Sequence, residues 1–548
     1  MIEPHSLLDI HFADFLTGRT GFEGEGRERF RGLILALSSA MASGHSCLPV
    51  KPEDSKLLLS TDLVSSGKKS PLVIFNDMLY LHRYFNYETR LARQISALAA
   101  KTAHIEVKND FLKKREPVND NETDWQQEAV KVALTQSLTI ISGGPGTGKT
   151  TTVVKIITML LKKVGLDLKI ALAAPTGKAA MRLRESIVKS IETMALPAEI
   201  KEAMPIDAKT LHRLLGVRRN SPQFRHNHEK PMAWDVVVVD EASMVDLALM
   251  SKLVDGLKQD ARLILLGDKD QLASVESGAV LVDLIKSLPA NTVELQKTYR
   301  FDSRIKQLAE SINKGDSTSA WSLLQDPSRG NISLLAGDLI SYVGMRYAEY
   351  MQVAVNTREQ GLKDLFQLFN SFQILCGVHF GRMGVEGMNH SVEFSLTRRG
   401  YDCRHDNWYT GRPVLVTCND YSLDLYNGDI GICLPDEKDG GFKVWFERGD
   451  GSMRAYSPHR LPRCETVFAM TVHKSQGSEF DEVIVVLPEE DNKILSRELI
   501  YTAVTRARTT VKIVAQPDIF RDALSRNIER FSGLAGQLDK NLSVSDNL

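Results

Sequence analysis

The sequence has little that would mark a secreted, metal-bound or membrane protein. Its 548 residues include six cysteines and no Cys-x-x-Cys pair, which argues against a zinc or iron–sulfur site and favours reduced thiols. The first residues, Met-Ile-Glu-Pro-His, lack the basic start and apolar core of a signal peptide. The apolar runs near Leu33 and Ile156 are interrupted by polar residues well short of membrane-spanning length. We therefore expect a cytoplasmic protein.

The chain also lacks an excess of either charge. Lysine and arginine number 68 and aspartate and glutamate 69, so the formal net charge is -1 at pH 7. Any affinity for nucleic acid must then come from cations gathered in a local groove, because phosphate contacts depend on clustered charge. A hydrophobic content of 43% and a charged content of 25% are typical of globular proteins, and the length predicts three or four domains.

Hydrophobic patterning divides the chain into regions of different character. Residues 1–115 look helical, as in 79–85, where leucine and aromatic positions recur at helical spacing. The polar stretch 113–124 is typical of a linker. Beyond it, short aliphatic runs alternate with helical segments, which predicts an α/β fold with open, doubly wound parallel sheets. The runs that predict buried strands are 138–141, 170–173, 236–239 and 263–266.

A second α/β region follows the first and is interrupted by a segment of different composition. That segment has Asn-Gly-Asp and Asp-Gly-Gly turn signals between short strands, which predicts a small β-barrel-like insertion. The polar C-terminal tail is expected to be frayed. The expected boundaries are 1–115 for the helical domain, 120–290 for the first α/β domain with a hairpin excursion at 218–231, 291–410 with 466–530 for the second, 411–465 for the β-rich insertion and 531–548 for the tail.

A phosphate-binding loop follows the first expected strand. Residues 143–150, Gly-Gly-Pro-Gly-Thr-Gly-Lys-Thr, fit G-x-x-x-x-G-K-[ST] between a strand and a helix, a context that disfavours a chance match. Glycine N–H groups can turn toward phosphate oxygens, and the helix N-terminus adds its dipole. Lys149 can place its charge on the phosphates, and Thr150 can bind magnesium. The residues predicted to hold the nucleotide here are Gly143, Gly144, Pro145, Gly146, Thr147, Gly148, Lys149, Thr150 and Thr151.

Polar side chains follow two later strands of the same region. Asp240 and Glu241 come directly after four valines, where a carboxylate at the end of a parallel strand lies beside the phosphate loop. Asp240 would hold magnesium and Glu241 would orient or deprotonate the attacking water, although capping a helix is an alternative for both. Gln271, in Gly-Asp-Lys-Asp-Gln-Leu, can reach the γ-phosphate or belong to an ordinary turn.

Polar residues at expected strand ends are candidates for a nucleic-acid track. Proteins that move along a single nucleic-acid strand need groups at strand ends that donate hydrogen bonds to phosphates. Such contacts carry little sequence information. Each candidate is, taken singly, equally consistent with a solvated loop. The excursion at 218–230 contains Pro222 and Phe224, while His226 and His228 have no partners that would make a metal site. The predicted DNA-binding residues are Pro175, Thr176, Lys178, Thr210, His212, Thr471, His473 and Lys474.

The order of these motifs resembles the superfamily 1 DNA helicases and, within them, the RecD family, the alpha subunits of the RecBCD enzyme (exonuclease V). The resemblance covers residues 120–515, including Thr-Tyr-Arg at 298–300 and the blocks at 471–480 and 501–508, and extends more weakly to 79–88. It implies two RecA-like motor domains with an SH3-like insertion, and ATP and Mg²⁺ as cofactors. It further implies 5′→3′ unwinding of DNA in recombinational double-strand break repair, with RecB and RecC as partners.

The resemblance also implies roles for single residues. Gln126 would read the adenine, and Arg300 and Arg506 would be arginine fingers that stabilise charge on the γ-phosphate. Glu479 would lie near the ribose or the motor interface, with helix capping or a salt bridge as the alternative. The excursion at 218–230 would be a hairpin that helps to split the duplex, with a flexible loop as the alternative.

Three other functions compete with this interpretation. A phosphate-loop switch would need neither second-domain arginines nor stimulation by DNA. A stand-alone helicase of the RecD-like type is chemically indistinguishable from a complex subunit, although a helical N-terminal domain without catalytic residues favours a partner-binding module. A nuclease is disfavoured because no carboxylate-plus-lysine cluster resembles a nuclease site, so any exonuclease activity would belong to a partner chain.

Overall fold

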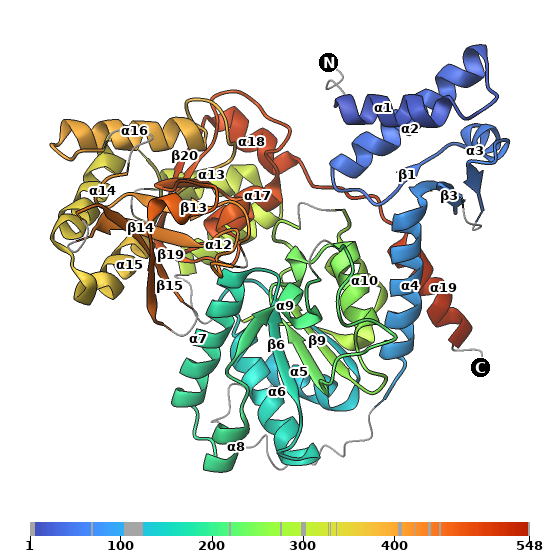
Figure 1. Ribbon diagram of the computed structural model, residues 1–548, viewed down its shortest axis with the longest axis horizontal. Helices are drawn as coiled ribbons and strands as arrows, with labels where there is room; N and C mark the ends of the chain where they lie inside the picture. The colour runs from blue at the N-terminus through green and yellow to red at the C-terminus, as the bar shows by residue number, and fades with distance from the viewer. Residues whose placement is uncertain are drawn as a thin grey trace.

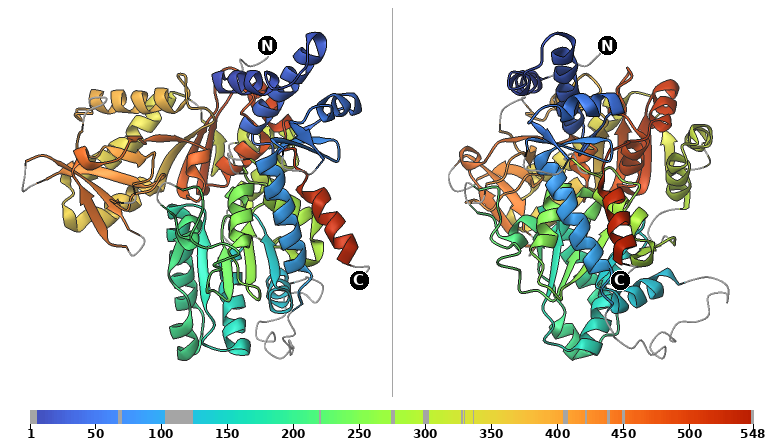
Figure 2. Two further views of the ribbon diagram at one scale, coloured as in Figure 1. Left: turned by 45° about the vertical axis from the view of Figure 1, so that its right-hand side comes forward. Right: turned by 90° about the vertical axis from the view of Figure 1, so that its right-hand side faces the viewer.

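Two parallel β-sheets covered by helices form the two lobes of the molecule (Figure 1), which confirms the predicted α/β class. Within the described residues, no helix is both long and apolar enough to cross a membrane. Figure 2 shows the N-terminal helices at one end of the two lobes and the last helix alongside the first lobe. The computed structural model describes residues 6–66, 70–102, 124–218, 221–273, 277–297, 303–326, 328, 330–335, 337–403, 408–420, 422–436, 440–448 and 451–545.

The first sheet has the strand order β10-β5-β9-β8-β6-β7, with every pair parallel. The four predicted strands are confirmed as β5 (Leu138–Ser142), β6 (Ile170–Ala174), β8 (Val236–Val239) and β9 (Arg262–Gly267). Their continuous aliphatic runs suit a sheet whose two faces are both buried. The other elements of this lobe are β7 (Ala208–Thr210), β10 (Thr292–Glu294), α5 (Trp125–Thr135), α6 (Lys149–Val164), α7 (Gly177–Thr193), α8 (Ala198–Ala203), α9 (Leu211–Leu215), α10 (Leu247–Asp255) and α11 (Val280–Ser287).

The second sheet has the order β11-β20-β19-β12-β18 and is also parallel throughout. Its strands are β11 (Ile332–Leu334), β12 (Phe372–Cys376), β18 (Ala469–Thr471), β19 (Phe480–Val486) and β20 (Ala507–Val514). The sheet is therefore built from segments before and after the insertion, as the hydrophobic pattern of the sequence predicts. The helices around it are α12 (Ser303–Asn313), α13 (Ser317–Gln325), α14 (Leu339–Asn356), α15 (Leu362–Ser371), α16 (Val385–Arg398), α17 (Arg497–Val504) and α18 (Pro517–Ser525).

The segment between the two halves of this sheet folds as a five-stranded antiparallel sheet. It has a small core of its own, in which Val414, Val444 and Phe446 are buried. An antiparallel sheet with its own core explains why the sequence pattern changes from continuous apolar runs to short strands with turns. Its strands are β13 (Pro413–Val416), β14 (Ile430–Pro435), β15 (Phe442–Glu447), β16 (Met453–Tyr456) and β17 (Cys464–Thr466).

The N-terminal region is not purely helical, so that expectation is wrong. Asn76 and Asp77 adopt left-handed backbone conformations (φ +48° and +57°), which suits the tight turn of a hairpin, and the residues after them form a strand. The helix expected over 79–85 therefore begins only at His82. The elements of this region are α1 (Leu7–Thr17), α2 (Gly24–Ala42), α3 (Pro52–Leu59), α4 (His82–Ala99), β1 (Leu48–Pro49), β2 (Val64–Ser65), β3 (Leu72–Phe75) and β4 (Met78–Leu81).

The C-terminal tail is a helix, α19 (Leu534–Ser545), and the expectation of a frayed tail is wrong. Leu534 and Leu538, four residues apart, are fully buried and share a core with Leu91 and Ile95 of α4 and with one face of the first sheet. The tail carries few apolar residues, but two of them on one helical face are enough once α4 supplies the other side. The linker predicted at 113–124 lies almost wholly outside the described residues.

A buried carboxylate joins α4 to the C-terminal segment. Glu88 is fully buried, and burial raises its pKa to about 7. Its oxygens accept hydrogen bonds from the Ser46 hydroxyl (2.5 Å), the Ser532 hydroxyl (3.2 Å), the Gly533 N–H (3.3 Å) and the Gln537 amide (3.3 Å). One side chain thus satisfies donors from segments more than 440 residues apart.

Replacing Glu88 by alanine should loosen α19. The substitution leaves several buried donors without an acceptor, and each such group costs about 1–3 kcal/mol. We expect a lower melting temperature for Glu88→Ala and faster proteolytic cleavage after α18, measured by limited digestion and mass spectrometry. The exposed Glu28→Ala on α2 is the control, and equal cleavage rates in the two variants would contradict this role.

Candidate nucleotide site and nucleic-acid groove

The predicted phosphate loop joins β5 to α6. Gly146 and Gly148 adopt φ values of +77° and +84°, which L side chains rarely adopt, so the loop needs glycine at both positions. The Lys149 ammonium donates to the carbonyl oxygens of Gly143 (2.6 Å) and Gly144 (3.1 Å). The lysine head therefore lies inside the loop, where a phosphate would meet it. Pro145 and Thr147 complete the loop, and Thr150 and Thr151 stand in the first turn of α6.

Two carboxyl groups lie at the ends of neighbouring strands facing this loop. Asp240 follows β8 and Asp268 follows β9. Burial raises the pKa of each from 3.8 to about 6, and the charge of Lys149 opposes that rise. Glu241 has a strained left-handed backbone (φ +52°) and donates its N–H to Asp240 Oδ1 at 2.9 Å. Buried carboxylates beside a lysine suit a bound cation and phosphate.

Gln271 is buried and binds a neighbouring acid. Its amide donates to Asp268 Oδ2 at 3.1 Å, and the Tyr501 hydroxyl of α17 donates to the same oxygen at 3.1 Å. The residue Gly144 is close as well, since a Cβ there would lie 3.1 Å from the Tyr501 hydroxyl oxygen. Sequence reasoning did not assign Asp268 or Tyr501, although both lie within motifs that it quoted.

The same stretch is bonded to the second lobe at two further points. The Leu272 N–H donates to Thr502 Oγ1 at 2.9 Å, and the Gln476 amide donates to the Leu272 carbonyl at 2.8 Å. Residues 268–272 of the first lobe are therefore held by α17 and by the loop that follows β18 in the second. A change at the phosphate loop can reach the second lobe through these bonds.

Arg506 enters this boundary from the second lobe. Its side chain is 2% exposed, with Nε donating to the Thr502 carbonyl (3.2 Å) and Nη1 donating to the Ser478 carbonyl (3.2 Å). Its Nη2 is buried and has no hydrogen-bond partner among the described residues. A buried donor without an acceptor costs about 1–3 kcal/mol. An anion reaching Nη2 would give it the acceptor that it lacks; the arginine-finger role of Arg506 stays a prediction.

A charge cluster around Glu479 joins α7 to the start of β19; the sequence predicts Glu479 near the ribose or the motor interface, or in a salt bridge, but does not predict Arg182 as its partner. Arg182 donates to the Glu479 carbonyl at 3.1 Å, and Arg508 pairs with the Glu479 carboxylate at 3.2 Å. Burial lowers the pKa of Arg182 to about 10, and Arg506 and Arg508 lower it further, while Glu479 opposes them. Glu479 thus lies between the two lobes. The only sequence signal for Arg182 is its place on the helix that follows Ala-Pro-Thr-Gly-Lys.

Two further predicted residues have different outcomes. Gln126, near the start of α5, accepts a hydrogen bond from Lys155 of α6 at 2.7 Å, so it lies beside the helix that follows the phosphate loop. Arg300, predicted as a second arginine finger, lies outside the described residues together with the rest of 298–302.

Three of the predicted DNA-binding hydroxyls stand at the carboxyl ends of strands. Thr176, with Pro175, follows β6 and caps α7; Thr210 ends β7 and caps α9. Thr210 and Ala174 are partners in neighbouring parallel strands, so these two caps are adjacent. Thr471 ends β18 in the second lobe. Hydroxyls at such positions can donate to backbone phosphates.

The predicted DNA-binding cations differ in how far other groups of the protein already contact or bury them. Lys178 has its ammonium 5.6 Å from the Phe480 ring, and burial lowers its pKa to about 7. Lys474 pairs with Glu465 at 2.5 Å, and burial lowers the pKa of His473. His212 is exposed on α9. An anion near Lys178 would favour the charged form of its amine and so oppose the effect of burial.

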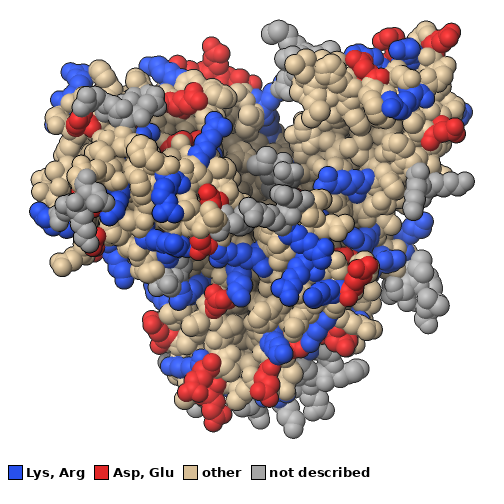
Figure 3. All heavy atoms as spheres, in the orientation of Figure 1, with Lys and Arg blue, Asp and Glu red and all other residues tan. Residues whose placement is uncertain are grey.

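A cavity of about 550 Å³ brings some of these candidates together. Its walls come from the start of α7, from the region of α9, from α15 and from the β insertion, and Lys178, Thr210, Arg213 and Arg454 line it. Thr471, His473 and Lys474 are not among its lining residues. Lys and Arg side chains gather across the middle of the face shown in Figure 3, where the lobes meet.

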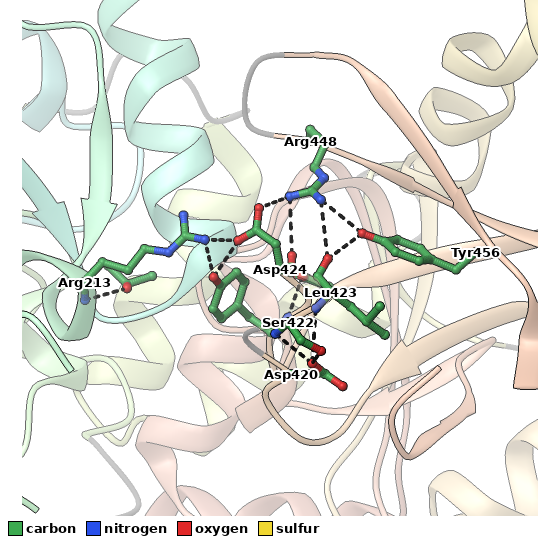
Figure 4. Close-up of polar contacts among 10 residues, drawn as sticks. Arg213, Asp420, Ser422, Leu423, Asp424, Arg448 and Tyr456 are labelled. Carbon is green, nitrogen blue, oxygen red and sulfur yellow. Dashed lines mark hydrogen bonds and ion pairs between the residues drawn. The ribbon is translucent and has the colours of Figure 1, made fainter. Parts of the chain in front are cut away.

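Two arginines that line this cavity converge on Asp424 (Figure 4). Arg213 of α9 and Arg448 of the insertion both bind the Asp424 carboxylate, and Arg213 also contacts the Tyr426 hydroxyl. Tyr456 donates toward the same loop and accepts from Arg448 at 3.0 Å. Arg213 directly follows the predicted DNA-binding residue His212, but the sequence gives no sign of its link to the insertion.

Comparison with known proteins agrees with this arrangement. Residues 126–277 match the AAA domain model, and 466–514 match the UvrD-like helicase C-terminal domain model. The RecBCD enzyme subunit RecD of Mycolicibacterium smegmatis is 39% identical over 490 residues, covering 86% of this chain and 84% of that protein. The same subunit of Haemophilus influenzae is 35% identical over 531 residues, covering 86% and 81%.

The chain belongs to the RecD family. It is an ATP-dependent DNA helicase, in line with its similarity to the ATP-dependent RecD2 DNA helicase of Deinococcus radiodurans, 31% identical over 461 residues covering 83% of this chain and 56% of that protein. A solved Pif1 helicase from Bacteroides, bound to ADP-AlF3 and ssDNA, is 17% identical over 77% of this chain and 97% of that one, with a TM-score of 0.42, and carries no argument about sites.

Asp240→Asn should make this RecD-family chain more heat-stable yet inactive. Because folding raises the pKa of Asp240 from 3.8 to about 6, this carboxyl lowers the free energy of unfolding as the pH rises from about 4 to about 6. Above about pH 6 the lowering stays at its full size. In the absence of nucleotide, Asp240→Asn should melt at a higher temperature than the parent at about pH 7.5, with the gap shrinking toward about pH 5. Asp167→Asn, on the exposed surface, is the control. A difference in melting temperature between Asp240→Asn and the parent that does not change with pH would contradict the raised pKa of Asp240.

Arg506→Ala should separate nucleotide binding from turnover. Loss of an arginine finger lowers the catalytic rate on the order of 10³-fold, while phosphate-loop contacts remain. ATPase kinetics and binding of a fluorescent ADP analogue measure the two effects. Arg508→Ala, at a half-exposed neighbour, should change the rate far less. Weakened binding with normal turnover at saturation would argue against the finger.

Proposed function

We propose that this chain is the motor subunit of a RecBCD-type helicase–nuclease and moves 5′→3′ on single-stranded DNA during recombinational repair of double-strand breaks. The observation that carries the motor assignment is the buried, unpartnered Nη2 of Arg506 at the boundary between the lobes. A phosphate-loop switch has no need of such a group from a second domain. The direction and the RecB and RecC partners rest on membership of the RecD family.

The residues around the phosphate loop fit ATP with magnesium. The loop N–H groups and Lys149 would hold the phosphates, and Thr150 with Asp240 would hold the ion. Bound magnesium polarises the phosphoryl oxygens and neutralises charge on them. Glu241 would orient the water, and Arg506, joined by Arg300, would stabilise charge as the phosphoryl bond breaks. Gln126 would read the base, with Glu479 at the interface or the ribose.

Coupling between the nucleotide and the strand would pass through the bonds at 268–272. Asp268 and Gln271 face the phosphate loop, while Leu272 is bonded to Thr502 and Gln476. Gln476 lies in the loop after Thr471, which we propose as the second lobe's contact with DNA. Closure on ATP would therefore move Thr471 relative to Thr176 and advance the strand. The remaining proposed contacts are Pro175, Lys178, Thr210, His212, His473 and Lys474.

The rest of the chain would serve assembly. We interpret the region before the first motor domain as the partner-binding module, and the five-stranded insertion as an SH3-like barrel that closes over the strand. Nuclease activity would come from a partner subunit. A cytoplasmic location agrees with six cysteines that form no disulfide.

Strand displacement on tailed duplexes tests the proposal. The chain alone should displace a strand from a 5′-tailed duplex and leave a 3′-tailed one intact. Lys149→Gln is the control and should abolish displacement while retaining DNA binding. Displacement only from the 3′-tailed substrate would overturn the direction, and an ATPase rate unchanged by single-stranded DNA would favour the switch.

A further inference from the structure

A loop of the β insertion reaches the first motor lobe. The backbone N–H groups of Asp420 and Leu425 donate to each other's carbonyl oxygens at 2.7 and 3.0 Å, which pairs the two ends of the loop. Between them, Asp424 pairs with Arg213 of α9 in the first lobe. Arg213 also donates to the Tyr426 hydroxyl, and its guanidinium carbon lies 4.6 Å from the centre of that ring. One guanidinium of the first lobe is thus bound by two side chains of the insertion.

The backbone at Asp424 is strained where it makes this contact. Its φ is +59°, in the left-handed region that residues other than glycine seldom adopt. Such conformations cost free energy and persist where the surrounding structure holds them, often at ligand-binding or switching sites. Here the carboxylate is held by Arg213, by Arg448 and by the Tyr426 hydroxyl, which donates at 2.6 Å (Figure 4). The strained backbone therefore places one carboxylate between arginines of the first lobe and of the insertion.

The two partners differ in what each would keep if the contact opened. Arg448 and Tyr426 belong to the insertion, so the Asp424 carboxylate would retain a cation and a hydrogen-bond donor. Among the residues described, no hydrogen bond or ion pair ties the Arg213 guanidinium to its own lobe, since its acceptors, Asp424 and Tyr426, are both on the insertion. The Arg213 and Asp424 side chains are 45% and 35% exposed, and an ion pair this exposed is weak. Opening would therefore cost little and would leave Arg213 in need of another anion.

Arg213 lies beside the proposed DNA contacts of the first lobe. Its backbone N–H donates to Thr210 Oγ1 at 3.2 Å, and it lines the same cavity as Lys178 and Thr210. Asp429 of the insertion lines this cavity too, and its charge opposes the fall in the pKa of Lys178. Carboxylates of the insertion thus stand next to the cations that would meet the phosphates of a strand. The acidic residues that line the cavity are Asp207, Asp424, Asp429 and Glu447.

We propose that Arg213 is a site for a backbone phosphate of single-stranded DNA and that the Asp424 carboxylate competes with the strand for this site. A guanidinium binds phosphate and carboxylate oxygens with the same fork of N–H donors, so one anion can replace the other. As a phosphate takes Arg213, Asp424 stays with Arg448 and the insertion separates from α9. The contact between the insertion and α9 then depends on whether a strand is bound. The inference rests on the proposed DNA-motor function and adds a competing anion to its groove.

The test is a double-mutant cycle on the full chain, with affinity for a single-stranded oligonucleotide measured by fluorescence anisotropy. Asp424→Asn removes the competing charge and should bind DNA roughly threefold more tightly at low salt, the scale of an exposed ion pair. Its logarithmic salt slope should steepen by up to about 0.7, because one more phosphate is then fully neutralised. Arg213→Gln should bind DNA more weakly than the parent. In the Arg213→Gln background Asp424→Asn should lose most of its effect, because the two changes act through one contact.

Two further variants make the result specific. Asp207→Asn removes one negative charge from the same cavity, but Asp207 pairs with Lys209 at 3.5 Å and its side chain is 76% exposed. It should change DNA affinity less than Asp424→Asn does and leave the ATPase rate unaltered. Asp424→Gly removes the carboxylate at a position whose φ suits glycine, so it should fold and should also bind DNA more tightly than the parent.

Two outcomes would overturn the inference. One is that Asp424→Asn and Asp424→Gly bind DNA no more tightly than the parent, which would make the contact purely structural. The other is a gain from Asp424→Asn that is equally large in the Arg213→Gln background, or that Asp207→Asn reproduces in full, which would make it a general effect of charge. Failure of the proposed function is distinguishable, because the parent would then show no stimulation of its ATPase by single-stranded DNA.

Discussion

The hydrogen bonds that hold residues 268–272 against α17 are the constraint on which the rest of the molecule depends. Asp268 faces the phosphate loop while receiving the Tyr501 hydroxyl, and four residues later Leu272 is bonded to Thr502. These bonds tie the two sheets, which could otherwise belong to independent domains, to each other through the short loop that follows β9. They join the phosphate-loop side of the first lobe to α17, which precedes Arg506, and to the loop after β18.

The site carries desolvated charge of both signs, and this has an energetic meaning. Burial raises the pKa of Asp240 and Asp268 and lowers those of Lys178 and Arg182. Each group is less stable in its charged form here than in water, so each gains from an opposite charge brought by a ligand. A cation with phosphates at the phosphate loop would reduce the cost of this buried charge. A chain of phosphates at the groove would do the same there. The electrostatics of the resting molecule therefore favour binding.

Sequence reasoning succeeded where local pattern decides the structure and failed where distant segments decide it. The four valines at 236–239 favour a strand, because β-branched residues suit a buried sheet, and the positive φ values at 146 and 148 need glycine. The apolar residues around Leu79 also recur at helical spacing, so the pattern alone does not distinguish a helix from a strand. Only the tight turn at Asn76 makes this segment a strand. The local sequence around Arg182 does not reveal its partner, because Glu479 lies 297 residues away. Arg300 falls outside the described residues, so its role stays a prediction.

The pairing of the two ends of the chain has a consequence for synthesis. Ser46 donates its N–H to the carbonyl of Phe531 at 3.0 Å, and α19 supplies part of the core of α4. The ribosome makes α4 long before it makes α19, so Glu88 and the part of α4 that α19 covers stay without that cover until α19 is made. A chain that stopped after α18 would keep the residues of the phosphate loop but would leave Glu88 and this side of α4 without their cover.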